Sequence, residues 1–244
     1  METTARFAPA AANAFMFLLI PAAVALAIAY YVSQYPPAFA HPSQAAALQL
    51  SLLAPIVFLG AAGVFLSIAS GMTPNPLSGE SGLSSALWSG LLLGTVVYAA
   101  DHVSGFSQVL ADQLKIKSIH IAFPASLYVY TAGAIAVECL YRFIPIAFLY
   151  ALIAQVALGG RGERFVFWSL AILSSMIEPL SQAPLAGREP NLMWALFGLI
   201  FVFNMSEVAL WRRYGWIAPL VARLVFYGVW HVALGPLVSG TLTG

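Results

Sequence analysis

Long apolar runs separated by short polar connections dominate the sequence. A run of about 18 or more apolar residues predicts a membrane-spanning helix, because the hydrocarbon core of a bilayer is about 30 Å thick and a helix rises about 1.5 Å per residue. The pattern predicts spans at residues 14–33, 45–70, 84–103, 119–137, 143–158, 164–181, 191–211 and 214–239. We therefore expect an all-α, polytopic transmembrane helix bundle of about eight spans.

The stretch 119–158 decides that number. It is too long for one helix across a bilayer, and Pro145, just after Arg142, stands where a proline breaks or kinks a helix. We expect a hairpin of two spans here. With eight spans and both termini outside, the residues on the inner side, where basic residues collect, are Lys115, Lys117, Arg161, Arg164, Arg212 and Arg213. With seven spans the two lysines lie outside and this bias is weaker.

Composition supports a membrane protein and excludes several other classes. The chain is 61% hydrophobic and 8% charged, whereas a soluble domain carries about 25% charged residues. A net charge of +1 gives no reason to expect a nucleic-acid partner, and Cys139, the single cysteine, excludes an internal disulfide or a Cys-rich metal site. We expect one integral membrane domain over residues 1–244, in contact with membrane lipids and without a metal or cofactor.

Polar residues within the predicted spans are the candidates for a functional site, since each costs several kcal/mol in a bilayer unless it is paired. They are Glu138, Arg142, Glu178, Asn204, Glu207, Arg223, Tyr227 and His231. Spacings of three or four residues place 138 with 142, 204 with 207, and 223 with 227 and 231 on shared helix faces. We expect the acids and arginines to neutralise one another. The residues expected to face one interior cavity are Glu138, Arg142, Glu178, Arg223, Tyr227 and His231.

The stretch "VECLYRFIP" resembles the first motif, Glu-Glu-x-x-x-Arg, of the CPBP group of intramembrane proteases, with Glu138 as the second Glu and Arg142 as the Arg. This group includes CAAX prenyl endopeptidases and bacterial bacteriocin-processing and abortive-infection homologues. Its third motif is a His four residues before an Asn or Asp; here the corresponding positions hold Arg223 and Tyr227. The resemblance covers about residues 128–239. It implies a protease-like core in a bacterial inner membrane and a hydrophobic or prenylated peptide as substrate.

The chain departs from this pattern where the family's chemistry takes place. Val137 stands at the position of the first Glu, and no His accompanies Glu178 where the motif Phe-x-x-x-His should follow. The resemblance implies that a Glu and a His take a proton from water while a His and an Asn stabilise the oxyanion. A substitute catalytic set is chemically conceivable, with Glu138 or Glu178 as base. The substitute donors to the oxyanion would be Arg223, Tyr227 or His231.

Three functions therefore stay open. The first is a glutamic-type intramembrane peptidase. The second is a catalytically silent relative that binds a hydrophobic or transmembrane peptide, or a partner membrane protein, as a structural or assembly subunit; Val137 favours it over the first. The third is a small membrane transporter, against which the lack of a detectable inverted repeat counts. Purely structural roles are the alternative for the pair Glu138 and Arg142 and for His231, and Asp101 and His102 are expected at the membrane interface.

Overall fold

The structure is a computed structural model and describes residues 2–37, 42–76, 82–182 and 190–239. Within these ranges the ordered elements are all helical, as expected from the sequence. The α-helices are α1 (Glu2–Phe17), α2 (Ala23–Gln34), α3 (Pro42–Ala47), α4 (Leu50–Ala69), α5 (Leu83–Ser104), α6 (Phe106–Leu114), α7 (Ala125–Glu138), α8 (Pro145–Tyr150), α9 (Glu163–Gln182), α10 (Pro190–Tyr214), α11 (Ile217–Tyr227) and α12 (Gly235–Ser239). Wider π-helical segments are η1 (Leu18–Ala22), η2 (Cys139–Phe143), η3 (Ala151–Ala157) and η5 (Gly228–Leu234).

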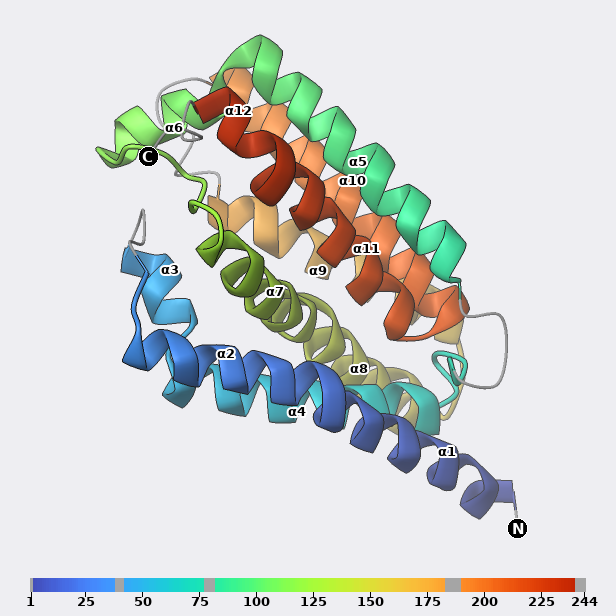
Figure 1. The fold of residues 1–244 in the computed structure, drawn as a ribbon. Helices are drawn as coiled ribbons and strands as arrows, with labels where there is room; N and C mark the ends of the chain where they lie inside the picture. The colour runs from blue at the N-terminus through green and yellow to red at the C-terminus, as the bar shows by residue number, and fades with distance from the viewer. Residues whose placement is uncertain (1, 38–41, 77–81, 183–189, 240–244) are drawn as a thin grey trace.

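The long helices form a bundle in which α7 and α8 lie between two groups (Figure 1). On one side, α1 packs on α4, α2 packs on α7, and α4 packs on η2 and α8. On the other side, α11 packs on α5, α7 and α10, and α9 packs on α10 and α8. The helical run over residues 125–157, which comprises α7, η2, α8 and η3 and is called the central helix below, therefore presents one face to each group.

Five helices of the described chain are long and apolar enough to cross a membrane: Arg6–Gln34, Leu50–Ala69, Leu83–Ser104, Ala125–Ala157 and Ile217–Leu237. They confirm an all-helical protein with helices that are long and apolar enough to span a membrane. The predicted spans 164–181 and 191–211 are also helical, as α9 and α10.

The hairpin predicted within 119–158 is wrong, because residues 125–157 form one continuous helical run. The proline is accommodated by a π-helical turn: the Ile144 N–H donates to the Cys139 carbonyl, five residues back, at 2.9 Å. Pro145 has no N–H for the Tyr141 carbonyl four residues earlier. The Ser174 hydroxyl of α9 donates to that carbonyl instead. A neighbouring helix thus supplies the hydrogen bond whose loss would otherwise favour a break.

Close helix contacts depend on glycine at two crossings. A Cβ atom on Gly63 of α4 would lie 1.8 Å from the Phe143 carbonyl oxygen in η2, and one on Gly90 of α5 would lie 2.5 Å from the Ala222 carbonyl oxygen in α11. Small residues let backbones approach in membrane bundles, where packing replaces the hydrophobic effect between helices. Both groups of helices are held by such contacts.

Gly63→Ala should lower the free energy of unfolding by about 1–3 kcal/mol, because the new methyl group overlaps backbone that cannot move aside. Gly133→Ala is the matched control, since a Cβ atom there meets nothing within 4 Å and alanine favours the helix. Reversible unfolding in mixed detergent micelles measures both. Equal stability of the two variants would contradict the close α4–η2 contact.

Candidate functional site: a buried ion-pair network beside a cavity

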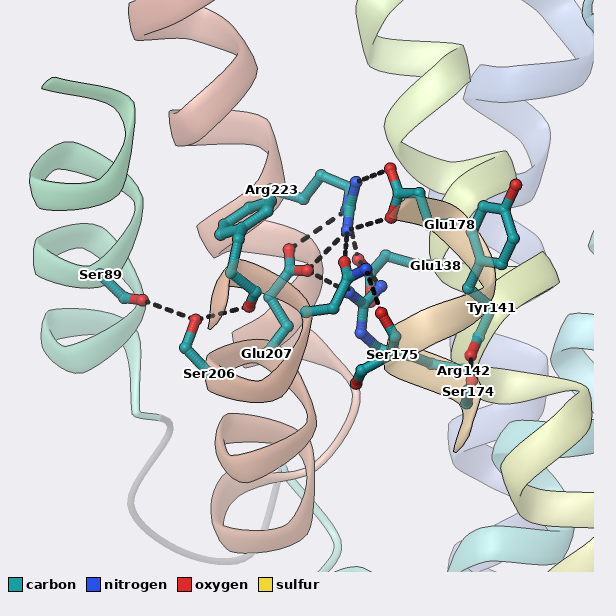
Figure 2. A network of polar contacts seen from close by, with 12 residues as sticks. Ser89, Glu138, Tyr141, Arg142, Ser174, Ser175, Glu178, Ser206, Glu207 and Arg223 are labelled. Carbon is teal, nitrogen blue, oxygen red and sulfur yellow. Dashed lines mark hydrogen bonds and ion pairs between the residues drawn. The ribbon is translucent and has the colours of Figure 1, made fainter. Parts of the chain in front are cut away.

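Arg223 of α11 lies among carboxylates from three other helices (Figure 2). Its Nε donates to Glu138 Oε1 of α7 at 2.7 Å, and its Nη2 donates to Glu207 Oε2 of α10 at 2.6 Å. Its Nη1 and Nη2 contact the two oxygens of Glu178 in α9, each at 3.3 Å. The guanidinium is 1% exposed, so these contacts replace the water that would otherwise solvate it.

Arg142 of η2 is the second cation of the network. Its Nη1 donates to Glu138 Oε1 at 2.7 Å, four residues back on the same helix. Its Nη2 donates to Asn204 Oδ1 at 2.6 Å and to Glu207 Oε2. Asn204 also donates to the Ser175 carbonyl of α9 at 3.2 Å. The network therefore ties the central helix to α9, α10 and α11 at one level of the bundle.

Sequence spacing identified most of this network. The structure brings together Glu138, Arg142, Glu178 and Arg223, and adds Asn204 and Glu207 from the same candidate set. Tyr227 joins at the edge, where its hydroxyl accepts a hydrogen bond from Arg223 Nη1 at 3.3 Å. His231 has no contact with these charges in the described chain and belongs to a separate cluster.

The network contains more acid than base. Three acidic side chains, Glu138, Glu178 and Glu207, face two guanidinium groups, so the network has one more formal negative charge than positive. Two buried atoms, Oε2 of Glu138 and Nε of Arg142, have no partner within the described ranges. Loss of an arginine would increase the imbalance, whereas loss of a carboxylate would remove it.

A cavity of about 570 Å³ opens next to the network. It is lined by Ala47, Leu110, Leu114, Ile116, Ile119, Tyr130, Tyr141, Glu178, Ser181, Ile200, Phe203, Arg223, Phe226, Tyr227, Trp230 and His231. The expectation that all six candidate residues face one cavity therefore holds for four. Glu138 and Arg142 do not line the cavity. They lie in α7 and η2, where both side chains are buried and form ion pairs with other members of the network.

A second polar cluster contains residues that the sequence did not single out. Asp101, expected at the interface, is fully buried, whereas its neighbour His102 is exposed. Asp101 accepts hydrogen bonds from the backbone N–H of Ser107 at 2.9 Å and from its hydroxyl at 2.5 Å. His120 Nε2 lies 3.4 Å from that hydroxyl, and its Nδ1 lies 3.1 Å from Nδ1 of His231. In the structure Ser107 lies in α6 and His120 in the connection before α7, although the predicted span 119–137 included His120. Neither residue stood three or four positions from another candidate, so helical spacing gave no signal for them.

Neither cluster has the composition of a metal centre. Among the described residues there is no group of three or more His, Cys, Asp or Glu side chains that could hold a metal ion. The ion-pair network connects four helices through non-covalent contacts, and it presents one carboxylate, Glu178, to the cavity. What the histidine cluster can do is bind or release a proton at the end of the bundle where α6 lies.

Arg142→Gln should lower the free energy of unfolding by about 3–5 kcal/mol, because it leaves Arg223 as the one cation for three buried carboxylates of the network. Glu138→Gln should cost less, since the amide oxygen still accepts both hydrogen bonds and the formal charge of the network falls to zero. Arg213→Gln, an exposed arginine on α10, is the control and should change little. Unfolding midpoints in detergent measure the stability of all three variants. A larger loss of stability for Glu138→Gln than for Arg142→Gln would contradict the excess of acidic side chains in the network.

The folded state should lose stability below about pH 6.5. Burial lowers the pKa of His120 from 6.5 to about 4, although the nearby Asp101 carboxylate opposes the shift. Between these values the unfolded chain binds a proton that the folded chain does not, so stability present above pH 6.5 is lost as the pH falls toward 4. His120→Gln should flatten the dependence of the melting temperature on pH in this window, whereas His102→Gln should leave it unchanged.

Comparison with known proteins provides no relative from which to transfer a function. No family model, no curated protein and no solved structure matches this chain. The CPBP resemblance therefore stays a prediction from short motifs, and the function has to be argued from the geometry of the site.

Proposed function

We propose that the protein is a catalytically silent, CPBP-like integral membrane protein that acts as a structural or assembly subunit. Its partner in this proposal is a hydrophobic or transmembrane peptide, or another membrane protein, within a bacterial inner membrane. The observation that carries the proposal is the state of Glu138, which is fully buried and held through one oxygen by both arginines. A carboxylate in this position cannot reach a water molecule and a scissile peptide together.

The rest of the network supports a structural role. Arg223 occupies the position where the resemblance places an oxyanion-stabilising His, and its donors already contact Glu138, Glu178 and Glu207. An oxyanion needs donors aimed at empty space, where the substrate will develop charge. The side chains that would be catalytic in a protease instead connect four helices here.

Peptidase activity is the second candidate, and one observation favours it. Glu178 lines the cavity next to Tyr227, so a carboxylate and a hydroxyl do face a space that a peptide could enter. Within the described chain the Glu178 carboxylate contacts Arg223, and no histidine accompanies it. Water activation by Glu178 alone would be weak general-base catalysis.

The arrangement in the membrane follows from the single helix over 125–157. We propose seven crossings, made by α1–α2, α4, α5, α7–η3, α9, α10 and α11–α12, in place of eight. The first crossing begins at one end of the bundle and the last crossing ends at the other (Figure 1). The described arginines at the end where α1 begins are Arg6, Arg161, Arg164, Arg212 and Arg213; Lys115 and Lys117 lie at the other end. The positive-inside rule then favours a cytoplasmic N-terminus and an external C-terminus, instead of both termini outside.

A run of 33 residues fits one crossing if it is tilted or kinked. At about 1.5 Å per residue a helix of this length measures about 50 Å, against a hydrocarbon core of about 30 Å. Tilting, kinking and extension into the headgroup region accommodate such an excess. The π-helical segments η2 and η3 are the places where this helix departs from a straight axis.

The purified full-length chain should not cleave fluorogenic hydrophobic or farnesylated peptides above the rate without protein. Blue-native electrophoresis of gently solubilised native membranes should show the chain in a discrete complex larger than the chain alone. Cleavage by the wild-type protein that is abolished in both Glu178→Gln and Glu138→Gln, with Asp112→Asn unaffected, would overturn the proposal in favour of a peptidase. Migration as the free chain would contradict the assembly role.

A further inference from the structure

The cavity beside the network has the size and lining of a site for a small amphiphile. Its volume, about 570 Å³, lies within the range of about 300–1,000 Å³ found for ligand pockets. One part of its wall is the aliphatic segment that contains Leu110, Leu114, Ile116 and Ile119. The polar part is made by side chains that contact one another, namely Glu178, Arg223 and Tyr227.

The polar part is suited to a cation and unsuited to an anion. Each nitrogen of the Arg223 side chain already has at least two acceptors within 3.3 Å, so this guanidinium has no free donor to offer. Glu178 is the one acid of the network that lines the cavity, and its contacts with Arg223 at 3.3 Å are longer than those of Glu138 and Glu207. A cation at Glu178 would lie beside a network in which acidic side chains outnumber guanidinium groups.

Aromatic side chains surround the place where a cationic head would lie. Tyr130, Tyr141, Tyr227 and Trp230 all line the cavity. Arg223 lies over the ring of Tyr227 at 5.6 Å, whereas the rings of Tyr141 and Trp230 have no guanidinium contact in the described chain. The faces of such rings attract ammonium groups, most strongly where water is excluded. A carboxylate together with aromatic walls is a favourable environment for an organic cation.

The other charged groups around the cavity do not oppose this assignment. Asp101 lies behind Trp230, whose indole N–H donates to Asp101 Oδ2 at 3.4 Å, and it adds negative charge. His120 beside it is uncharged near pH 7, because burial lowers its pKa to about 4. Lys115 and Lys117 alternate with the lining residues Leu114 and Ile116, but both are exposed and neither lines the cavity.

We propose that this cavity binds an amphiphilic organic cation, with its ammonium group on Glu178 among the aromatic side chains of the lining and its hydrocarbon chain along the aliphatic wall of α6 and the segment that follows. The shared chemistry is a primary or quaternary ammonium on an alkyl chain, supplied either by a lipid headgroup or by a free amine. Binding of this kind goes beyond the assembly role and does not depend on it.

Thermal unfolding of the full-length protein in a neutral maltoside detergent, with four decyl probes below their micelle concentrations, tests the site. Decylammonium and decyltrimethylammonium should raise the melting temperature saturably, whereas decanol and decanoate should not. Glu178→Gln should weaken the apparent affinity for decylammonium at least tenfold, and Asp112→Asn, an exposed carboxylate on α6, should leave it unchanged. A response to decanoate equal to that for decylammonium, or full binding by Glu178→Gln, would overturn the proposal.

A second variant keeps the test decisive if Glu178→Gln fails to fold. Ile200→Trp fills the cavity from α10 without changing any charge, and it should abolish the response to both ammonium probes. An unchanged response would place the probe elsewhere and overturn the proposal. Native mass spectrometry separates the two sources of the cation: retention of phosphatidylethanolamine in the wild-type protein but not in Ile200→Trp assigns a lipid headgroup. A response to the free amine without retained lipid assigns a soluble amine.

Discussion

The burial of Arg223 and Arg142 among three carboxylates is the constraint on which the rest of the structure depends. Five charged groups at membrane depth can be kept only if each finds partners inside the protein, because lipid offers none. The partners come from four different helices, so each helix is held at a fixed height and rotation. The network thus favours one arrangement of the bundle over others with the same apolar packing.

The central helix contributes Glu138 and Arg142 to the network at the point where its α-helical geometry changes to a π-helical turn. Glu138 ends α7, Arg142 lies in the π-helical turn that follows, and Pro145 begins α8. The two charges contact residues of α10 and α11, and the chain passes the proline without reversing direction. Gly63 of α4 permits the same segment to pack closely on the opposite side. One irregular segment thereby serves both groups of helices.

The polar residues of the network differ in whether they are enclosed by protein or line the cavity. Glu138, Arg142 and Glu207 are enclosed, while Glu178, Tyr227 and one side of Arg223 meet the cavity. A protease of the resembled type needs its base where substrate and water arrive; here Val137 stands at the position of the first Glu, and Glu138 next to it is enclosed. The accessible side offers the Glu178 carboxylate as an acceptor together with aromatic rings, the groups on which the proposed binding of an organic cation depends.

The sequence by itself determined that the protein is a bundle of apolar helices, because hydropathy and helix length depend on local composition. It also determined the main buried charges, since polar side chains at three- and four-residue spacing must share a face and find partners. Tertiary structure alone decided that 125–157 is one helix, because the hydrogen bond that accommodates Pro145 comes from Ser174 on another helix. It also decided that Glu138 is enclosed while Glu178 is accessible, and that Ser107 and His120 meet Asp101 and His231. These outcomes depend on which helices become neighbours, and no spacing within one helix contains that information.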